Sequence, residues 1–182
     1  MNKTVINFFT IADYEEEELW LRQMHQNGYK LVNMYIPCFY VFEECEKEDV
    51  IYRLDYRSYE PDDYYWQMLK DFGWEHFAHC LNWHYYRKKA DQLENAEDGE
   101  LFSDNASRVE MISSVIRTKM MPIIVIFLCC VAPNFGRYLS GEAFGPWDRF
   151  FMLFYSIMFV IYVYLICHCG LKLRKLKDKY SN

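Results

Sequence analysis

The spacing of apolar residues divides the chain into a mixed N-terminal part and an apolar C-terminal part. In the first part, short runs rich in β-branched and aromatic residues predict strands. The predicted strands are Lys3–Ile11, Tyr29–Ile36, Phe39–Glu44, Val50–Arg57, Trp74–Leu81 and Trp83–Lys89. The clearest alternation of apolar and polar residues falls in Val50–Arg57, which predicts a strand buried on one face only.

Cap and turn residues predict two helices between these strands. Asp13 is typical of a helix N-cap, and Gly28 is typical of the residue that follows a helix. Pro61–Asp63 predicts the start of a second helix, and Gly73 its end. The acidic run Glu15–Glu18 falls in the first turns, where the helix dipole favours anions. We interpret the run as a solvated helix start, with an acidic docking surface as the alternative.

A repeat relates the two halves of this region. Gly28–Tyr29 recurs as Gly73–Trp74, 45 positions later, and the same offset brings Tyr40 onto Tyr85. Each half has the order strand, helix, strand, strand. The sequence therefore predicts an α+β fold, in which a duplicated βαββ cytosolic domain at 1–89 forms a mainly antiparallel sheet with both helices on one face.

The C-terminal part predicts a two-helix transmembrane hairpin. Phe150–Leu171 contains no Asp, Glu, Lys or Arg and is long enough to cross a bilayer, at about 1.5 Å per residue. Met120–Gly136 is also uncharged, and Pro122 and Pro133 suit the ends of its helix. Ser107 with Glu110 fits a capping box before it.

These patterns predict how the chain is divided after residue 89. The predicted parts are an acidic linker and junction at 90–107, a juxtamembrane helix at 108–119, transmembrane helix 1 at 120–139, an external loop at 140–148, transmembrane helix 2 at 149–171 and a basic cytosolic tail at 172–182.

Charge separates the two parts further. Residues 1–107 hold ten Lys and Arg against 22 Asp and Glu, whereas residues 108–182 hold ten against four. An acidic domain repels phosphates, so we expect no nucleic-acid partner. Basic residues precede the first apolar segment and follow the second, which predicts a multi-pass protein of the cell membrane with both termini in the cytoplasm and the lipid bilayer as its partner.

Two groups of histidines and cysteines contain the residue types that bind zinc or copper. The first lies in the strand region and the second in the apolar segments. On a regular strand, His76 and Cys80 would share one face and His79 would take the other, so the members of the first group would not converge easily. We interpret both groups as structural, with a metal site as the alternative, and expect no metal and no cofactor. The residues are His76, His79, Cys80 and His84 in the first group, and Cys129, Cys130, Cys167, His168 and Cys169 in the second.

Two further groups are candidates for binding or coupling. Arg53, Asp55 and Arg57 project from the face of their strand opposite the apolar stripe. This pattern indicates a solvated ladder or a polar floor for a ligand, which Trp83 and Tyr85 would extend. Turn and cap residues precede the first apolar segment, where they form a helix cap or a coupling motif between the domain and the hairpin. This motif comprises Ser103, Asp104, Asn105, Ser107 and Arg108.

Several phrases of the chain resemble a family of bacterial two-span membrane proteins catalogued as domain of unknown function number 2812. The resemblance covers about the first two-thirds of the chain, and ELFSDN-x-SR is its most specific phrase. It implies a cytosolic domain on a membrane hairpin, mostly in Gram-positive bacteria, and no catalytic or binding residues. The phrases are EEEELWLRQMHQNGYKLV (15–32), YRLDY (52–56), DFGWE (71–75), WHYYRKK (83–89) and ELFSDNASRVEMI (100–112).

The sequence contains no Gly-rich phosphate loop, G-x-S-x-G, H-E-x-x-H or C-x-x-C motif, so we expect no enzymatic activity. We expect a membrane-anchored cytosolic sensor or small-ligand-binding module. Its element order is similar to that of gyrase-inhibitor-like effector-binding domains, which hold small hydrophobic ligands between two halves. The alternative is a protein-interaction anchor that sequesters a regulator or assists a transporter. The oligomeric state stays open.

Overall fold

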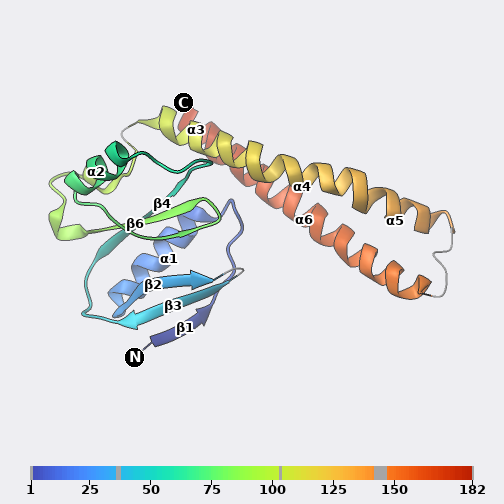
Figure 1. The fold of residues 1–182 in the computed structure, drawn as a ribbon, viewed down its shortest axis with the longest axis horizontal. Coiled ribbons are helices and arrows are strands. Elements are labelled where there is room, and N and C mark those ends of the chain that lie inside the picture. The colour runs from blue at the N-terminus through green and yellow to red at the C-terminus, as the bar shows by residue number, and fades with distance from the viewer. Residues whose placement is uncertain (1, 36–37, 103, 142–146, 182) are drawn as a thin grey trace.

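The computed structural model describes residues 2–35, 38–102, 104–141 and 147–181. Its N-terminal part, which we call the head, contains α1, α2 and the strands β1–β6 (Figure 1). The first predicted strand ends earlier than expected, and the predicted connection at Pro37 lies outside the described residues. The bounds are β1 Asn2–Ile6, α1 Tyr14–Gln26, β2 Tyr29–Tyr35, β3 Phe39–Glu44, β4 Val50–Tyr56, α2 Asp63–Asp71, β5 Glu75–Cys80 and β6 Trp83–Lys89.

The strands form two antiparallel sheets of three strands, in the orders β1-β3-β2 and β4-β6-β5. The α+β class and the antiparallel pairing are thus confirmed, whereas the expected single sheet is replaced by two. The sheets meet where β2 lies beside β5. Gly28 and Gly73 follow α1 and α2 with φ values of 89° and 81°. These left-handed conformations favour glycine, so the predicted helix ends are confirmed.

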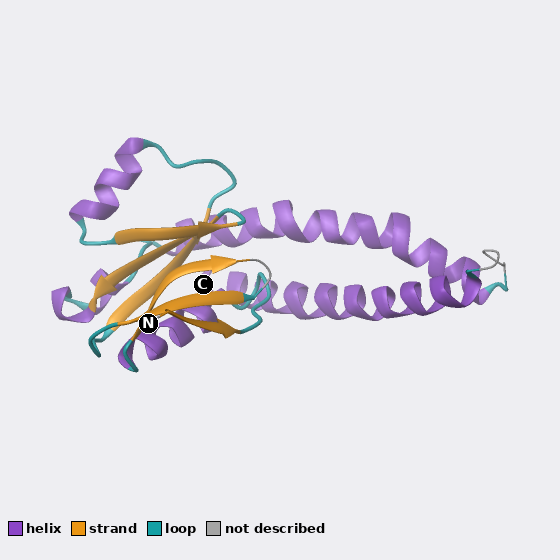
Figure 2. Ribbon diagram, turned by 60° about the horizontal axis from the view of Figure 1, so that its bottom comes forward, coloured by secondary structure: helices purple, strands orange, loops and turns teal. Residues whose placement is uncertain are grey.

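The two helices lie on opposite sides of the strands, as Figure 2 shows, so the prediction that both cover one face is wrong. On β4, Ile51 packs with Leu69 of α2, while its neighbour Tyr52 bonds to His25 of α1 over 2.8 Å. The strand is therefore buried on both faces rather than one. The reason is that β4 carries large apolar or aromatic side chains at successive positions, and both faces need cover.

Glu17 of α1 lies buried between the two sheets. Its Oε1 atom accepts hydrogen bonds from the hydroxyls of Tyr40 on β3, over 2.9 Å, and Tyr85 on β6, over 2.8 Å. These are the two tyrosines that the 45-residue offset pairs. Glu18 is buried as well, so the interpretation of the whole acidic run as solvated is wrong for these two residues.

The segment after β6 folds back onto the head before the long helices begin. It contains two short 3₁₀ turns, Ala90–Gln92 and Ala96–Gly99. Helix α3, Asn105–Val115, then starts with Asp104 as its N-cap, whose Oδ1 accepts the N–H of Ser107 over 2.8 Å. The helix begins at residue 105 rather than 108, because Asp104 and not Ser107 caps it.

The segments from α3 to α5 follow one another without a gap and form one long rod (Figure 1). The juxtamembrane helix and the first apolar helix are thus one element. Pro122 and Pro133 lie inside the rod, not at its ends, and each follows closely on a π-helical stretch, where the wider winding accommodates a residue without an N–H. The bounds are π-helix Ile116–Met120, α4 Met121–Ile126, π-helix Phe127–Val131 and α5 Ala132–Leu139.

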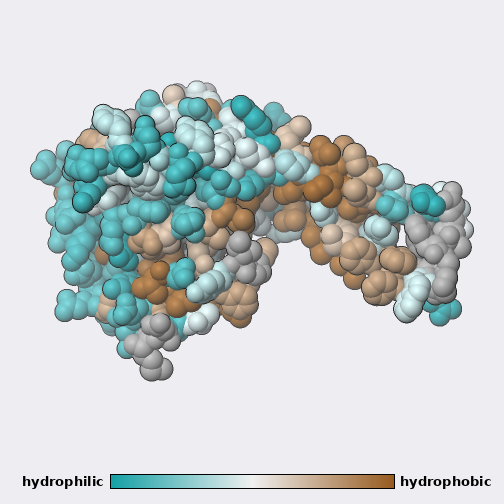
Figure 3. All heavy atoms as spheres, viewed as in Figure 1, coloured by the Kyte–Doolittle hydropathy of each residue, from teal (hydrophilic) through white to brown (hydrophobic). Residues whose placement is uncertain are grey.

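Helix α6, Asp148–Ser181, runs back along this rod, and together they form the hairpin. Two helical stretches, Asn105–Arg137 and Arg149–Ser181, are long and apolar enough to cross a membrane. Figure 3 shows hydrophobic residues over the hairpin and hydrophilic ones over most of the visible face of the head. The basic segment 172–181, predicted as a tail, continues α6 and packs on the head through Leu173 and Leu176. Most of the predicted external loop, at 142–146, lies outside the described residues.

Candidate functional site at the junction of head and hairpin

A chain of charged residues joins the head to the hairpin. Arg53 of β4 reaches Glu18 of α1 with its Nη1 over 3.3 Å and Glu100 with its Nη2 over 3.2 Å. Glu100 also pairs with Arg108 of α3, whose guanidinium lies 4.9 Å from the ring centre of Tyr180 near the end of α6. The chain therefore connects two residues that the sequence placed in separate candidate groups, Arg53 and Arg108.

Of the two acids in this row of ion pairs, Glu18 is buried and Glu100 is only partly covered. The Oε1 atom of Glu18 accepts the backbone N–H of Leu54 over 2.7 Å. Burial raises the pKa of Glu18 to about 8, although Arg53 and the N–H of Leu54 favour the ionised form. Burial thus makes this carboxyl group of the junction harder to ionise than an exposed glutamate.

A second set of ion pairs joins the acidic start of α1 to the basic end of α6. Lys172 donates to Asp13 over 2.5 Å, and Lys179 lies 3.2 Å from Glu15. Burial alone would raise the pKa of Asp13, but hydrogen bonds from Lys172 and Thr10 lower it to about 2. Asp13 stands at the N-cap position, yet its side chain makes no cap hydrogen bond because it holds these partners instead.

Asp55 and Arg57 tie α2 to β4. The Asp55 carboxylate, which is 1% exposed, accepts hydrogen bonds from Arg57 over 2.6 Å and from the hydroxyl of Tyr65 over 2.9 Å. The guanidinium of Arg57 stacks on the ring of Tyr65 at 3.7 Å. These residues are therefore partnered with one another, and they do not form an open ladder.

A groove runs between α2 and the start of α3, and we call it the junction groove. It consists of two hollows of about 230 and 560 Å³ that share Met68, Leu101 and Phe102. Asp55, Arg57 and Ser107 border the first hollow. The second is lined by Asp104, Asn105 and Arg108, together with Met68, Leu69, Phe72, Trp74, Lys88, Glu97, Asp98, Glu100, Leu101 and Phe102.

Most of the candidate residues line this groove, but Arg53, Trp83 and Tyr85 do not. In the register of β4 with β6, Tyr85 pairs with Leu54, and Trp83 pairs with Tyr56. Both side chains are buried against α1, on the face opposite Arg53 and Asp55. The expected common floor is therefore not formed. Ser103 lies outside the described residues.

The sequence did not indicate that Glu18 and Glu100 connect the two candidate groups. Glu18 is one of four consecutive glutamates, and only its position on the inner face of α1, which it shares with Glu17, distinguishes it from Glu15 and Glu16. Glu100 stands in a polar linker. The available signal was the phrase ELFSDN-x-SR itself, which begins with Glu100 and contains Arg108.

The histidine group is rearranged by a register shift between His76 and Ala78 on β5. His76 and His84 approach to 3.4 Å, and burial lowers the pKa of both. His79 pairs with His84, whereas Cys80 pairs with Trp83 and faces the core. The expectation that His76 and Cys80 share a face is therefore wrong.

The cysteines of the hairpin lie at different levels along it. Met120 packs near Gly170, whereas Phe127 packs on Phe159. Cys129 therefore stands about 13 Å along the rod from the level of Cys169, at 1.5 Å per residue. Within the described residues, no group of three or more His, Cys, Asp or Glu side chains is placed to hold a metal ion.

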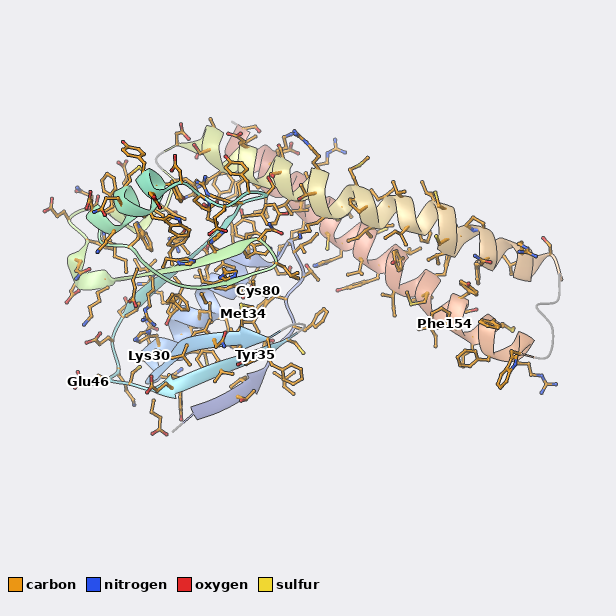
Figure 4. All side chains as sticks on the ribbon, viewed as in Figure 1. Lys30, Met34, Tyr35, Glu46, Cys80 and Phe154 are labelled. Atoms are coloured by element: carbon orange, nitrogen blue, oxygen red, sulfur yellow. The ribbon has the colours of Figure 1, made fainter. Side chains whose placement is uncertain are left out.

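Another hollow, of about 440 Å³, opens at the end of the head farthest from the hairpin, where Figure 4 labels Lys30 and Glu46. Two of its cations are paired, Arg87 with Glu75 and Lys89 with Glu48. We prefer the junction groove as the candidate site because its walls are continuous with the long helices.

The fold and the groove define an α+β domain that is packed onto an apolar helical hairpin. A family model described as a protein of unknown function, DUF2812, matches residues 13–126. The chain therefore belongs to the DUF2812 family, and the match covers the head from Asp13 onward, the junction and the first part of the rod. No curated protein and no solved structure matches the chain.

Proposed function

We propose that the protein is a membrane-anchored cytosolic sensor that binds a small ligand in the junction groove. The observation that carries this proposal is that Glu100 and Arg108 belong both to the groove and to the ion chain that links head and hairpin. A ligand that displaces either residue changes the contact between the two parts. Binding in the head would thereby be transmitted to the membrane.

The surface of the hairpin supports its insertion in a membrane. In the second apolar helix, none of the most hydrophobic 18-residue stretch is buried within the protein. An apolar helix in a soluble core would be covered. Arg117 and Lys119 precede the exposed part of the rod, and basic residues follow that of α6, so we place both termini in the cytoplasm. The head lies with them.

The head supports descent from a duplicated βαββ unit. Both sheets place the third strand of their half between the first and the second. Tyr40 and Tyr85, the equivalent residues of the two halves, donate to the same carboxylate oxygen of Glu17. The helix α1 and its side chains fill the space between the halves, so we propose the groove outside that core, and not the cleft between the halves, as the ligand site.

The lining of the groove indicates the class of ligand. Six acidic and three basic residues border the two hollows, and apolar side chains such as Met68 and Phe102 lie between them. Arg57 and Arg108 are already paired with acids. A small hydrophobic molecule with a positive charge satisfies this surface best, because its apolar part covers Phe102 and its charge meets the remaining carboxylates.

A thermal-shift measurement on the full chain in detergent tests the proposal. Hydrophobic cations are added as probes, with neutral and anionic compounds of similar size for comparison. A ligand at about 100 times its Kd adds about 2.7 kcal/mol to stability. We expect cations to raise the unfolding temperature most. No stabilisation by any of these classes would contradict the proposal.

Asp104→Asn provides a specific variant for this assay. Asparagine caps a helix about as well as aspartate, so α3 keeps its cap while the groove loses one negative charge. Asp62→Asn is the matched control, since Asp62 caps α2 in the same way but does not line the groove. We expect weaker stabilisation by cations in the first variant and an unchanged response in the second.

The exposed side chains of α2 favour a second function, that of a protein-interaction anchor. Tyr59, Tyr64 and Phe72 lie on or next to this helix and are each at least 65% exposed. Exposed aromatic side chains are typical of protein interfaces. Pull-down from detergent extracts tests this function, with Tyr64→Ser as the variant because Tyr64 does not line the junction groove. Recovery of the protein alone would count against it.

A further inference from the structure

Several large apolar side chains lie exposed at one end of the head, and we call them the apolar edge. They are Ile6, Phe8, Tyr35 and Leu81, each more than half exposed, together with Phe39. Ile6 and Tyr35 both pair with Phe39 in neighbouring strands. These three side chains therefore form a row on one face of the sheet β1-β3-β2. The other face of this sheet packs against α1.

The apolar edge lies at the end of the head from which the hairpin extends. In Figure 4, Tyr35 lies on the side nearer the hairpin, whereas Lys30 and Glu46 lie at the other end of the head. Phe8 leads into the loop that binds α6. Asn7, next to it, donates its N–H to the carbonyl of Cys38, which precedes Phe39.

Two contacts fix the level of this edge along the hairpin. Lys119 donates to Asn82, which follows Leu81, over 3.4 Å. Lys172 donates to Asp13, five residues after Phe8, over 2.5 Å. Lys119 is the last charged residue before the first apolar segment, and Lys172 is the first after the second. The edge therefore lies where the surface of the hairpin changes from charged to apolar.

Acidic residues gather at the opposite end of the head from the apolar edge. The end of β3 and the turn that follows it contain five acidic residues and one lysine over 43–49. Strand β3 runs from Phe39 at the apolar edge to Glu44 at the start of this turn. The acidic turn thus points away from the level at which the apolar surface of the hairpin begins. An anionic lipid surface would repel it and favour this orientation.

We propose that the apolar edge is a second membrane contact, which rests in the interfacial layer of the bilayer that the hairpin crosses. This inference depends on the membrane location proposed above. Lipid is the occupant because the edge lies at the level where the apolar surface of the hairpin begins, so a bilayer that covers that surface also reaches the edge. Phe8 and Tyr35 are of the aromatic type that settles at such interfaces.

Photocrosslinking in a bilayer tests the inference with the full chain. Phe8, Tyr35, Phe154 and Tyr64 are replaced one at a time by the photoreactive analogue benzoylphenylalanine. Each variant is reconstituted in vesicles of phosphatidylcholine and phosphatidylglycerol and illuminated, and lipid adducts are measured by mass spectrometry. A cooperative unfolding transition confirms that each variant is folded. Phe154, exposed on α6, reports on the hairpin, and Tyr64, exposed on α2, is the matched control on the head.

We expect lipid adducts at positions 8, 35 and 154 and none at 64. Adducts at 154 without adducts at 8 and 35 would overturn the membrane contact of the head while leaving the membrane location intact. Absence of adducts at 154 would overturn both. Crosslinks from position 8 or 35 to a second copy of the chain would also overturn the inference, because the edge would then be a protein interface.

Discussion

At the scale of single residues, Glu17 shows how burial changes the chemistry of an ordinary side chain. Burial raises its pKa from 4.5 to about 7, although the hydroxyls of Tyr85 and Tyr40 favour the ionised form. The folded chain therefore holds this proton more tightly than the unfolded chain. The stability that protonated Glu17 contributes is complete below pH 4.5 and is lost as the pH rises through about 7.

We predict that Glu17→Gln flattens this pH dependence. Glutamine keeps an oxygen that accepts from both tyrosines, but it has no proton to lose in this range. Between pH 4.5 and 8, the native chain should lose about 3 kcal/mol more stability than the variant, as a shift of this size implies. Thermal unfolding across this range measures the difference.

The exposed residue Glu94 offers a control for that measurement. Glu94→Gln removes an equivalent carboxylate from the surface, and its stability should follow that of the native chain at each pH. Glu18 titrates in all three proteins, so only the difference between curves reports on Glu17. Parallel curves for the native chain and Glu17→Gln would contradict the prediction.

Residue-level prediction succeeded where the partners are local. Helix α2 starts within the predicted stretch Pro61–Asp63, where Asp62 caps it by accepting the N–H of Tyr65, only three residues away. Asp13 was expected to cap α1 in the same way. Its carboxylate instead binds Lys172, 159 positions away, and no local pattern contains that partner.

At the scale of elements, the C-terminal extension of α6 is the main departure from expectation. Its basic residues indicated a tail, yet apolar residues recur within it every three or four positions, at Cys169, Leu173, Leu176 and Tyr180. This stripe packs against the head and α3. The helical spacing was a usable signal, but the charge of the segment obscured it.

We predict that Leu173→Ala destabilises the chain by about 2–5 kcal/mol, the usual range for truncation of a buried leucine. Leu173 is fully buried between α6 and its neighbours. Leu171→Ala is the matched control, because Leu171 is 63% exposed two residues earlier on the same helix. Unfolding in detergent should show a large loss for the first and little change for the second. Equal effects would show that the extension does not pack on the head.

The rod from α3 to α5 shows why proline positions misled the prediction. A proline inside an α-helix removes one hydrogen bond and crowds the carbonyl of residue i−4. Here each proline closely follows a π-helical stretch, so the crowded turn is already widened. Two short helices were expected in the place of one rod because the sequence does not mark π-helical turns.

At the scale of the whole molecule, the head is attached to the hairpin at several points. Arg53 holds it through Glu100, which also pairs with Arg108 of α3, and Asp13 holds it through Lys172 of α6. The hydroxyl of Tyr56 lies 2.7 Å from that of Thr118 on the rod. The linker at 90–102 is folded against the head. The head and the hairpin are therefore one packed unit, and residues of both line the junction groove.

Protease protection tests the orientation proposed for this unit. We predict that protease added to intact cells spares the head and cleaves at most the segment between α5 and α6, because the positive residues beside both apolar segments are retained inside. The fragments are identified by an antibody to the head. Cells made permeable provide the control, in which the head should be digested. Digestion of the head in intact cells would show the opposite topology.

The sequence alone determined the elements, the antiparallel strands, the glycines that end α1 and α2, and the two apolar helices, because each depends on neighbouring residues. It also indicated four polar candidate residues. Arg53, Asp55 and Arg57 alternate with apolar residues on a strand, and Arg108 follows a run of turn and cap residues. Only the tertiary structure decided that α1 and α2 lie on opposite faces, that Glu17 and Glu18 are buried, and that Glu100 connects head and hairpin. Those outcomes depend on which distant surfaces meet, and side-chain spacing along one segment contains no information about its distant partner.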